Sequence, residues 1–253
     1  MAPVNCPSTS SLFHADPDSP PTPRCFFQRL MGSLVHALKT RDDIRKEVSF
    51  LSSKLQSPTE HDLESALHVL RYLHSTPDEG PTYNSDEGVV LYGYSDAALG
   101  VHANGCSHSG FYVCVGRTNA ASVCKSRAHR DVALSPMNAE YYTLTELGKV
   151  LMYCRQFVAD LGFPQNGSTV IFEDNQPAID LSNAPQITRK SKHIFIQHHF
   201  IRELVQKKLV VIEHLPTASM TADMLTKSLA PKEFRYHRSH LFNSSCRHAA
   251  VTP

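Results

Sequence analysis

The sequence has 253 residues, a formal net charge of +1 and 41% hydrophobic residues, which suffices for one sizeable domain and a small second one. Because the charge is close to zero, the chain is not a strongly basic protein, and contact with nucleic acid would depend on local patches. No apolar run approaches the ~20 residues that cross a bilayer, and the first residues lack a signal-peptide pattern. We therefore expect an intracellular protein, cytoplasmic or nuclear, without a membrane partner.

Cysteine usage agrees with this compartment. The seven cysteines are an odd number and include no Cys-x-x-Cys pair. This pattern fits a reducing environment and argues against a disulfide framework and a structural zinc site.

The first part of the chain divides into a disordered segment and a helical one. Residues 1–24 are rich in Pro and Ser and have no periodicity, which is typical of disorder. Residues 25–80 have apolar residues at helical spacing, and Pro58-Thr59-Glu60 is typical of a helix start. Short helices of this kind bury themselves poorly alone, so we expect them to pack on the following domain or on a piece absent from the sequence.

From residue 84 to 230 the pattern predicts an α/β domain. Three strands at hairpin spacing, over Val89–Tyr94, Gly110–Gly116 and Ala121–Lys125, predict an antiparallel meander. Ser135-Pro136 then predicts the start of a long helix, with Ser as N-cap and Pro at the first position.

The later elements complete a mixed sheet. They are the long helix to about Leu161, a strand from Val170, helices over about 176–183 and 191–207, a strand over Lys208–Leu215, and a final helix starting over Ala222–Ser228. Residues 231–253 are basic, rich in His and without pattern, and are expected to be disordered. The order β-β-β-α-β-α-α-β-α predicts a five-stranded mixed sheet flanked by helices and preceded by a small helical segment.

Four carboxylates occupy comparable places in these elements. Asp96 follows the first strand, Asp174 ends the strand that begins at Val170, and Asp223 lies in the final helix. Glu140 lies on the inward, apolar face of the long helix, where a charged residue is unusual. Acidic side chains next to strand ends more often serve solubility than chemistry. If these four converge, however, they offer the oxygen ligands that Mg²⁺ prefers, and clustered carboxylates repel one another without cations.

Five motifs carry a resemblance to a known family. In chain order they are Tyr94-Ser-Asp-Ala97, Ala139-Glu-Tyr141, Glu173-Asp-Asn-Gln176, Lys192-His-Ile194 with His199-Phe-Ile-Arg-Glu203, and Ala222-Asp-Met-Leu-Thr-Lys227. As an ordered set they resemble the ribonuclease H domain of copia-type LTR retrotransposon Pol polyproteins. Upstream, Met31-Gly-Ser-Leu34, Arg41-Asp-Asp-Ile44 and Val69-Leu-Arg-Tyr-Leu73 resemble the end of the adjoining reverse transcriptase. The resemblance covers roughly residues 25–230.

The resemblance implies a ribonuclease H-like fold and cleavage of the RNA strand of RNA–DNA hybrids. Asp96, Glu140, Asp174 and Asp223 match the family's catalytic and metal-binding acids, which hold two Mg²⁺ ions, with Mn²⁺ as a substitute. Residues expected to contact the substrate are Ser95, Asn175, Gln176, Lys190 and Lys192. For Lys190 and Lys192, contact with the hybrid backbone and a merely solvated face are equally good interpretations.

Departures from the family pattern leave a second hypothesis open. Ala98 and Val123 stand where family members usually carry Trp, and the chain contains no Tyr-x-Asp-Asp polymerase motif. The first hypothesis is a Mg²⁺-dependent hybrid ribonuclease whose partners are the RNA–DNA hybrid and a reverse transcriptase polymerase domain absent from this chain. The alternative is an inactive, truncated retrotransposon remnant that keeps the fold and at most binds nucleic acid.

Overall fold

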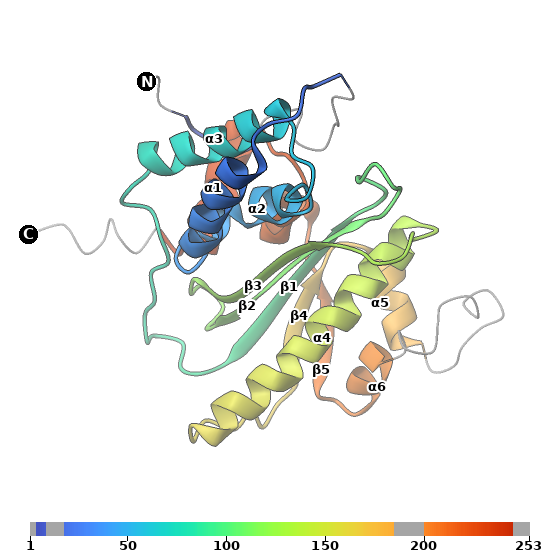
Figure 1. Cartoon of the computed structure of the whole chain (residues 1–253). Coiled ribbons are helices and arrows are strands. Elements are labelled where there is room, and N and C mark those ends of the chain that lie inside the picture. Colours follow the sequence, from blue (N-terminus) through green and yellow to red (C-terminus); the bar gives the residue numbers. More distant parts are fainter. Residues whose placement is uncertain (1–3, 9–17, 185–199, 245–253) are drawn as a thin grey trace, which may run out of the picture.

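The computed structural model describes residues 4–8, 18–184 and 200–244 of the chain. Within these residues, one five-stranded sheet lies between two groups of helices (Figure 1). A hydrophobic cluster packs on each face of the sheet.

The sheet has the strand order β3-β2-β1-β4-β5. β1 (Leu91–Ala98), β2 (His108–Val115) and β3 (Ala121–Ala128) form an antiparallel meander. β4 (Thr169–Glu173) runs parallel to β1, and β5 (Val210–His214) runs parallel to β4. The predicted meander and mixed five-stranded sheet are confirmed, and this strand order is that of the expected ribonuclease H-like fold.

β1 extends further than the sequence pattern predicted. Its antiparallel pairing with β2 continues as far as Ala98 opposite His108. Asp96 therefore lies within a strand, opposite Gly110, rather than in a loop that follows one. The apolar pattern ends at Tyr94, earlier than the strand, because the next two residues of β1 are the polar Ser95 and Asp96.

The long helix α4 (Pro136–Asp160) covers one face of the sheet, as predicted. Its N-cap is Ser135, whose Oγ accepts a hydrogen bond from the backbone N–H of Asn138 at 3.2 Å. Leu144 and Leu147 are completely buried in the cluster on this face. α5 (Gln176–Asn183) and α6 (Phe200–Gln206) lie on the same side. The first part of the helix predicted over about 191–207 lies outside the described residues.

The opposite face is covered by the N-terminal helical segment. It consists of α1 (Arg24–Ala37), the short 3₁₀ turn η1 (Asp42–Ile44), α2 (Arg45–Ser52) and α3 (Glu60–Ser75). Thr59 and Asp62 form a capping box at the start of α3, which confirms the helix start predicted there. These helices share one hydrophobic cluster with the sheet, so they pack on the following domain as expected.

Two predictions for the C-terminal part are wrong. Asp223 lies in a 3₁₀ turn, η5 (Thr221–Leu225), and not in an α-helix. The residues from Pro231, predicted to be disordered, begin a further helix, α7 (Pro231–Leu241). Pro231 favours an extended residue before it, which separates η5 from α7. The burial of Phe234 and Leu241, which lie seven residues apart on one face, orders α7. The charged residues between them made this apolar spacing hard to recognise in the sequence.

The N-terminal segment predicted to be disordered also has structure close to the first helix. Pro21 forms an isolated antiparallel bridge with Thr59, and α1 begins at Arg24. Most of residues 1–17 lie outside the described ranges.

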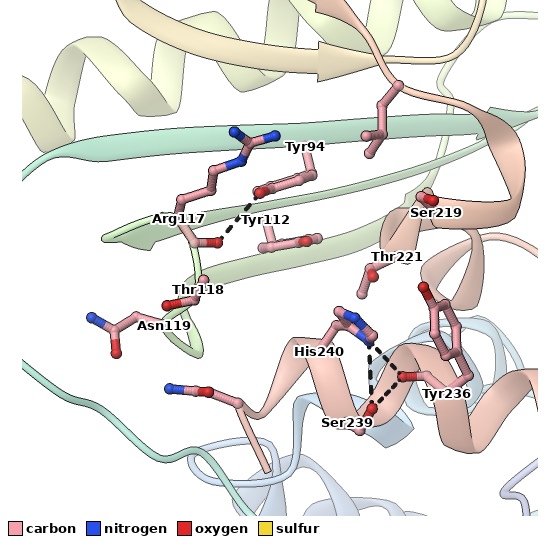
Figure 2. A pocket seen from close by; sticks show the side chains of 12 residues that line it. Tyr94, Tyr112, Arg117, Thr118, Asn119, Ser219, Thr221, Tyr236, Ser239 and His240 are labelled. Atoms are coloured by element: carbon pink, nitrogen blue, oxygen red, sulfur yellow. Dashed lines mark hydrogen bonds between the residues drawn. The ribbon is translucent and has the colours of Figure 1, made fainter. Parts of the chain in front are cut away.

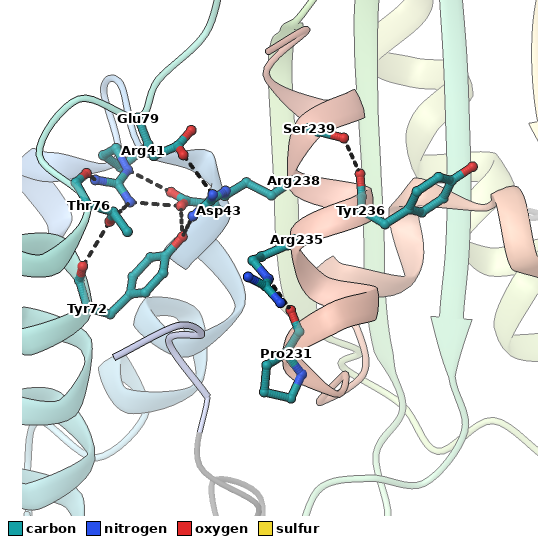
Figure 3. Close-up of polar contacts among 10 residues, drawn as sticks. All are labelled: Arg41, Asp43, Tyr72, Thr76, Glu79, Pro231, Arg235, Tyr236, Arg238 and Ser239. Carbon is teal, nitrogen blue, oxygen red and sulfur yellow. Dashed lines mark hydrogen bonds and ion pairs between the residues drawn. The ribbon is translucent and has the colours of Figure 1, made fainter. Parts of the chain in front are cut away.

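A buried polar network connects α7 to the N-terminal helices (Figure 3). The hydroxyl of Tyr72 donates to the Asp43 carboxylate, which also accepts two hydrogen bonds of 2.9 Å from the guanidinium of Arg41. Arg238 of α7 donates to the Tyr72 hydroxyl at 3.0 Å and to Glu79 at 2.7 Å. Burial, and then the Asp43 charge, raise the pKa of Tyr72 above its usual range. Helices far apart in sequence are thereby held together.

None of the helices in the described ranges is both long and apolar enough to cross a membrane.

Candidate active site

Three of the predicted acids meet at one edge of the sheet. β1 and β4 are parallel neighbours in which Tyr94 pairs with Phe172. Asp96 and Asp174 each follow this pair by two residues, so both lie at the same edge of the sheet. Glu140 reaches this edge from the start of α4. One carboxylate oxygen from each of the three lies within 4.8 Å of the others.

The Glu140 carboxyl group is buried, and one of its oxygens is unpaired among the described residues. Glu140 is 5% exposed, and its Oε2 has no hydrogen-bond partner among the described residues. Burial raises its pKa well above the usual range, and the charges of Glu173, Asp96 and Asp174 raise it further. A buried carboxyl group of this kind is costly unless it binds a proton or a cation.

Asp223 joins the site through a lysine. Lys227 Nζ lies 3.0 Å from Oδ1 of Asp96 and 3.0 Å from Oδ1 of Asp223, so one ammonium group bridges the two carboxylates. Thr226 also donates its hydroxyl to Asp96. Burial and the Asp96 charge raise the pKa of Asp223 to about 7, although Lys227 opposes the shift. Asp223 therefore stands next to Asp96 but outside the group of three oxygens.

A fifth carboxyl group at this edge was not among the predicted site residues. Glu173 is completely buried, accepts a hydrogen bond from Ser95 Oγ at 2.6 Å and accepts another from the backbone N–H of Asn175 at 3.1 Å. Burial raises its pKa to about 8, the two donors oppose the shift, and Asp174 and Asp96 add to it. Side chains alternate between the two faces of a strand, so Glu173 lies on the same buried face of β4 as Ile171. This alternation could have identified Glu173 from the sequence as an inward-facing carboxyl group.

The residues predicted to contact substrate have different environments. Ser95 is completely buried and donates to Glu173, so it holds that carboxyl group rather than facing a substrate. Asn175 caps α5, with its Oδ1 accepting from the backbone N–H of Ala178 at 3.1 Å. Gln176 is exposed next to Asp174. Lys190 and Lys192 lie outside the described residues.

The chain is similar in sequence to Pol polyproteins of plant transposons. The retrovirus-related Pol polyprotein from transposon TNT 1-94 of Nicotiana tabacum is 32% identical over 209 residues, which are 82% of this chain and 16% of that protein. The Pol polyprotein from transposon RE1 of Arabidopsis thaliana is 31% identical over 216 residues, which are 85% of this chain and 15% of that protein. The chain is a homologue of the Pol polyproteins of copia-type transposons. It spans about one sixth of the length of these relatives. No protein-family model matches it.

Solved structures with a similar chain path include ribonucleases H. LC11-RNase H1, isolated from compost by a metagenomic approach, matches with a TM-score of 0.42 and 15% identity over 54% of this chain and 92% of that one. The foamy viral protease-reverse transcriptase in complex with RNA/DNA hybrid matches with a TM-score of 0.39 and 18% identity over 63% of this chain and 22% of that one. Because both TM-scores are low, the fold assignment rests on the strand order described above.

Proposed function

We propose that the chain is a Mg²⁺-dependent endonuclease that hydrolyses the RNA strand of RNA–DNA hybrids. The observation that carries the proposal is the grouping of Asp96, Glu140 and Asp174, with their oxygens within 4.8 Å of one another. Glu140 Oε2 is buried and has no hydrogen-bond partner within residues 4–8, 18–184 and 200–244. The homology to transposon Pol polyproteins supports the substrate class.

The donor set fits a hard divalent cation. All three groups offer carboxylate oxygens, and Mg²⁺ or Mn²⁺ prefers such ligands. Asp96, Glu140 and Asp174 would hold one ion, and Asp223 would assist at a second next to Asp96 once Lys227 moves away. Bound ions of this kind supply an activated water and stabilise the leaving oxygen of a phosphodiester.

The chain's own residues prepare this site before any ion binds. Ser95 and the backbone of Asn175 fix Glu173 between β1 and β4, and this contact sets the spacing of the neighbouring Asp96 and Asp174. Thr217 donates to Asp174 Oδ2 at 2.7 Å and restricts that side chain as well. Gln176 is exposed next to Asp174, and its Nε2 donates to Asp180 at 2.8 Å. Its side-chain oxygen would accept from a 2′-hydroxyl, the group by which proteins distinguish RNA from DNA.

We also propose that residues 25–80 derive from the end of a reverse transcriptase and that residues 84–230 form the ribonuclease H unit. The three N-terminal helices pack on the face of the sheet opposite α4. A polymerase domain that contacts these helices would be a partner that helps to hold the hybrid.

One observation favours the second hypothesis of an inactive remnant. The Lys227 ammonium already forms ion pairs with Asp96 and Asp223, so these two carboxylates have a cationic partner without metal. The two hypotheses differ in whether a cation displaces this lysine.

Cleavage of a labelled RNA–DNA hybrid separates the hypotheses. The assay compares Mg²⁺, Mn²⁺ and EDTA for the wild type, for Asp174→Asn and for the control Asp160→Asn, which changes an exposed carboxylate at the last residue of α4. We expect metal-dependent cleavage by the wild type and the control, and at least a hundredfold loss in Asp174→Asn. Absence of cleavage by a wild type shown to be folded would reject the enzyme and leave the remnant.

A further inference from the structure

The residues that follow η5 contact the acidic edge. Thr226 donates its hydroxyl to Asp96, and the Lys227 ammonium lies 3.0 Å from Asp96 and 3.0 Å from Asp223. Thr226 is completely buried, whereas the Lys227 side chain is 38% exposed. A cation that binds to these two carboxylates therefore has to compete with an ammonium group whose position depends on residues 225–228.

The chain enters η5 beside an open pocket. This pocket of about 400 Å³ lies between the sheet and α7, and Tyr94, Ser219 and Thr221 are among the residues that line it (Figure 2). Close packing, which fixes most buried segments of a protein, is thus interrupted on the side where η5 begins. Hydrogen bonds at the other end of η5 then decide where Thr226 and Lys227 lie.

A buried lysine of α2 holds the carbonyl oxygen of Lys227. Lys46 is 2% exposed, and its Nζ donates to the Lys227 carbonyl oxygen at 2.7 Å and lies 3.4 Å from Ser228 Oγ. The same ammonium donates to Ser8 Oγ at 2.7 Å and forms an ion pair with Glu47 at 3.2 Å. Lysine side chains are almost never buried so completely unless they are paired, and here one of the partners is the backbone of Lys227.

A chain of hydrogen bonds from β2 and β3 holds the carbonyl oxygen of Leu225. Ser126 Oγ donates to this oxygen at 2.8 Å and lies 2.7 Å from His108 Nε2. His108 is completely buried, and its Nδ1 lies 2.9 Å from Nε2 of His102. Because Ser126 gives its one hydrogen to Leu225, His108 carries its proton on Nε2 and accepts at Nδ1. Burial, and then the charge of His102, lower the pKa of His108 to about 3, which keeps its ring neutral.

The two carbonyl groups that accept these hydrogen bonds lie on either side of Thr226. Lys46 comes from the N-terminal helices and Ser126 from β3, and both are distant from this segment in the sequence. When the backbone is fixed in this way, the Lys227 ammonium loses only side-chain freedom on pairing with the carboxylates. Because less conformational entropy is lost, the pairing is more favourable than it would be on a loose segment.

We propose that Lys46 and Ser126 are positioning residues that hold Lys227 on Asp96 and Asp223, and that this hold raises the Mg²⁺ concentration needed at the acidic edge. The inference rests on the proposed metal site. An ammonium on a freely moving segment would leave the carboxylates more easily, so a cation would bind at a lower concentration. Through Lys46, the N-terminal helices take part in the site in addition to packing on the sheet.

Hydrogen exchange of backbone amides tests the hold on this segment without metal or substrate. The amides of Thr226 and Lys227 donate to the carbonyl oxygen of Asp223 at 3.1 and 2.8 Å. Lys46→Met and Ser126→Ala each remove one of the two side-chain donors. In either variant, exchange at these two amides should rise about tenfold more than at the amides of β4, which report on unfolding of the whole sheet. If Lys46→Met does not fold, Ser126→Ala still decides the result.

Thermal melts over a range of Mg²⁺ concentrations test the link to the cation, because the stabilisation gives an apparent dissociation constant for Mg²⁺. We expect this constant to fall about threefold or more in Lys46→Met and Ser126→Ala, and about tenfold or more in Lys227→Met, which removes the ammonium itself. Lys207→Met is the matched control, since Lys207 also forms an ion pair with a carboxylate four residues away, Glu203. Its dissociation constant for Mg²⁺ should equal that of the wild type.

The outcomes separate a positioning role from a purely structural one. A purely structural loss would lower the melting temperature and leave the dissociation constant of Mg²⁺ unchanged or raise it, and that result would overturn the proposal. Unchanged exchange at Thr226 and Lys227, or no stabilisation by Mg²⁺ in the wild type and every variant, would overturn it as well. If the dissociation constant falls as expected but the hybrid is not cleaved, the proposed function fails and the role of Lys46 and Ser126 stands.

Discussion

The substitution Gly110→Ala should disturb the acidic site by displacing η5, which packs on Gly110. Gly110 lies opposite Asp96 in the sheet, and η5 packs directly on it. A Cβ at this position would lie 2.6 Å from the Leu225 Cβ and 2.7 Å from the Thr226 Cγ2. Real Cβ atoms essentially never have contacts under 3.0 Å, so η5 must move by at least the difference between 3.0 and 2.6 Å, which is 0.4 Å. Leu225 cannot avoid the contact by rotating, because the atoms involved are its Cβ and its backbone carbon.

The displacement has two expected consequences. Overpacking of this size lowers the free energy of unfolding by about 1–3 kcal/mol, which corresponds to a melting temperature lower by roughly 2–12 °C for a chain of this length. Because Thr226 and Lys227 follow η5 and contact Asp96, metal-dependent cleavage should also fall. Urea and thermal unfolding followed by circular dichroism measure the first effect, and the hybrid assay measures the second.

Gly32→Ala is the matched control. Gly32 lies in the interior of α1, and a Cβ there would meet nothing within 4 Å. Alanine should leave stability unchanged or raise the free energy of unfolding by about 0.5–1 kcal/mol, because glycine is the poorer helix former. If Gly110→Ala proves as stable and as active as Gly32→Ala, the described packing of η5 on β2 is wrong.

Three further predictions concern charge and hydrogen bonding. Without metal, the free energy of unfolding should rise as the pH falls from about 8 to about 5, because Glu173 (pKa about 8) and Asp223 (pKa about 7) take up protons in the folded chain before they do so in the unfolded one; urea titrations that show the opposite slope would contradict this. Mg²⁺ at ten times its dissociation constant should stabilise the chain by about 1.4 kcal/mol, and Asp174→Asn should abolish this shift in a thermal melt. Tyr72→Phe leaves a buried carboxylate without its hydroxyl donor and should cost about 1–3 kcal/mol in urea unfolding, whereas Tyr153→Phe, at a 73% exposed side chain, should cost nothing measurable.

Local patterns predicted much of the fold because the deciding signals are local. Ser135-Pro136 and Thr59 specify helix starts through capping groups close in sequence, and both helices begin where expected. The short helix over 176–183 was also predicted with its bounds, since Asn175 caps it and Pro177 lies in its first turn.

The missed features depend on contacts between distant segments. α7 is mostly polar and is ordered by two buried apolar side chains in the cluster shared with the N-terminal helices, so its own sequence did not indicate a helix. Glu173 was not predicted as a site residue, because its hydrogen bond from Ser95 joins two strands that are far apart in the sequence. The pocket beside Tyr94 combines two strands, a turn and α7, and no single segment reveals it.

Similarly, the convergence of the acids was predicted from the resemblance, whereas their individual environments were not. The sequence places Asp96, Glu140 and Asp174 at the ends of neighbouring elements, and the parallel register of β1 and β4 brings them together. That Lys227 bridges Asp96 and Asp223 depends on the side-chain geometry of η5 on the sheet and has no local signal.

The most direct test of the central claim is to identify which strand is cut. The purified chain, with Mg²⁺, would be given four substrates labelled on each strand: an RNA–DNA hybrid, duplex RNA, duplex DNA and single-stranded RNA, all of one sequence. We predict that only the RNA strand of the hybrid is cleaved, and that EDTA stops the reaction. Cleavage of the DNA strand, equal cleavage of the other substrates, or no cleavage at all by the folded chain would contradict the account.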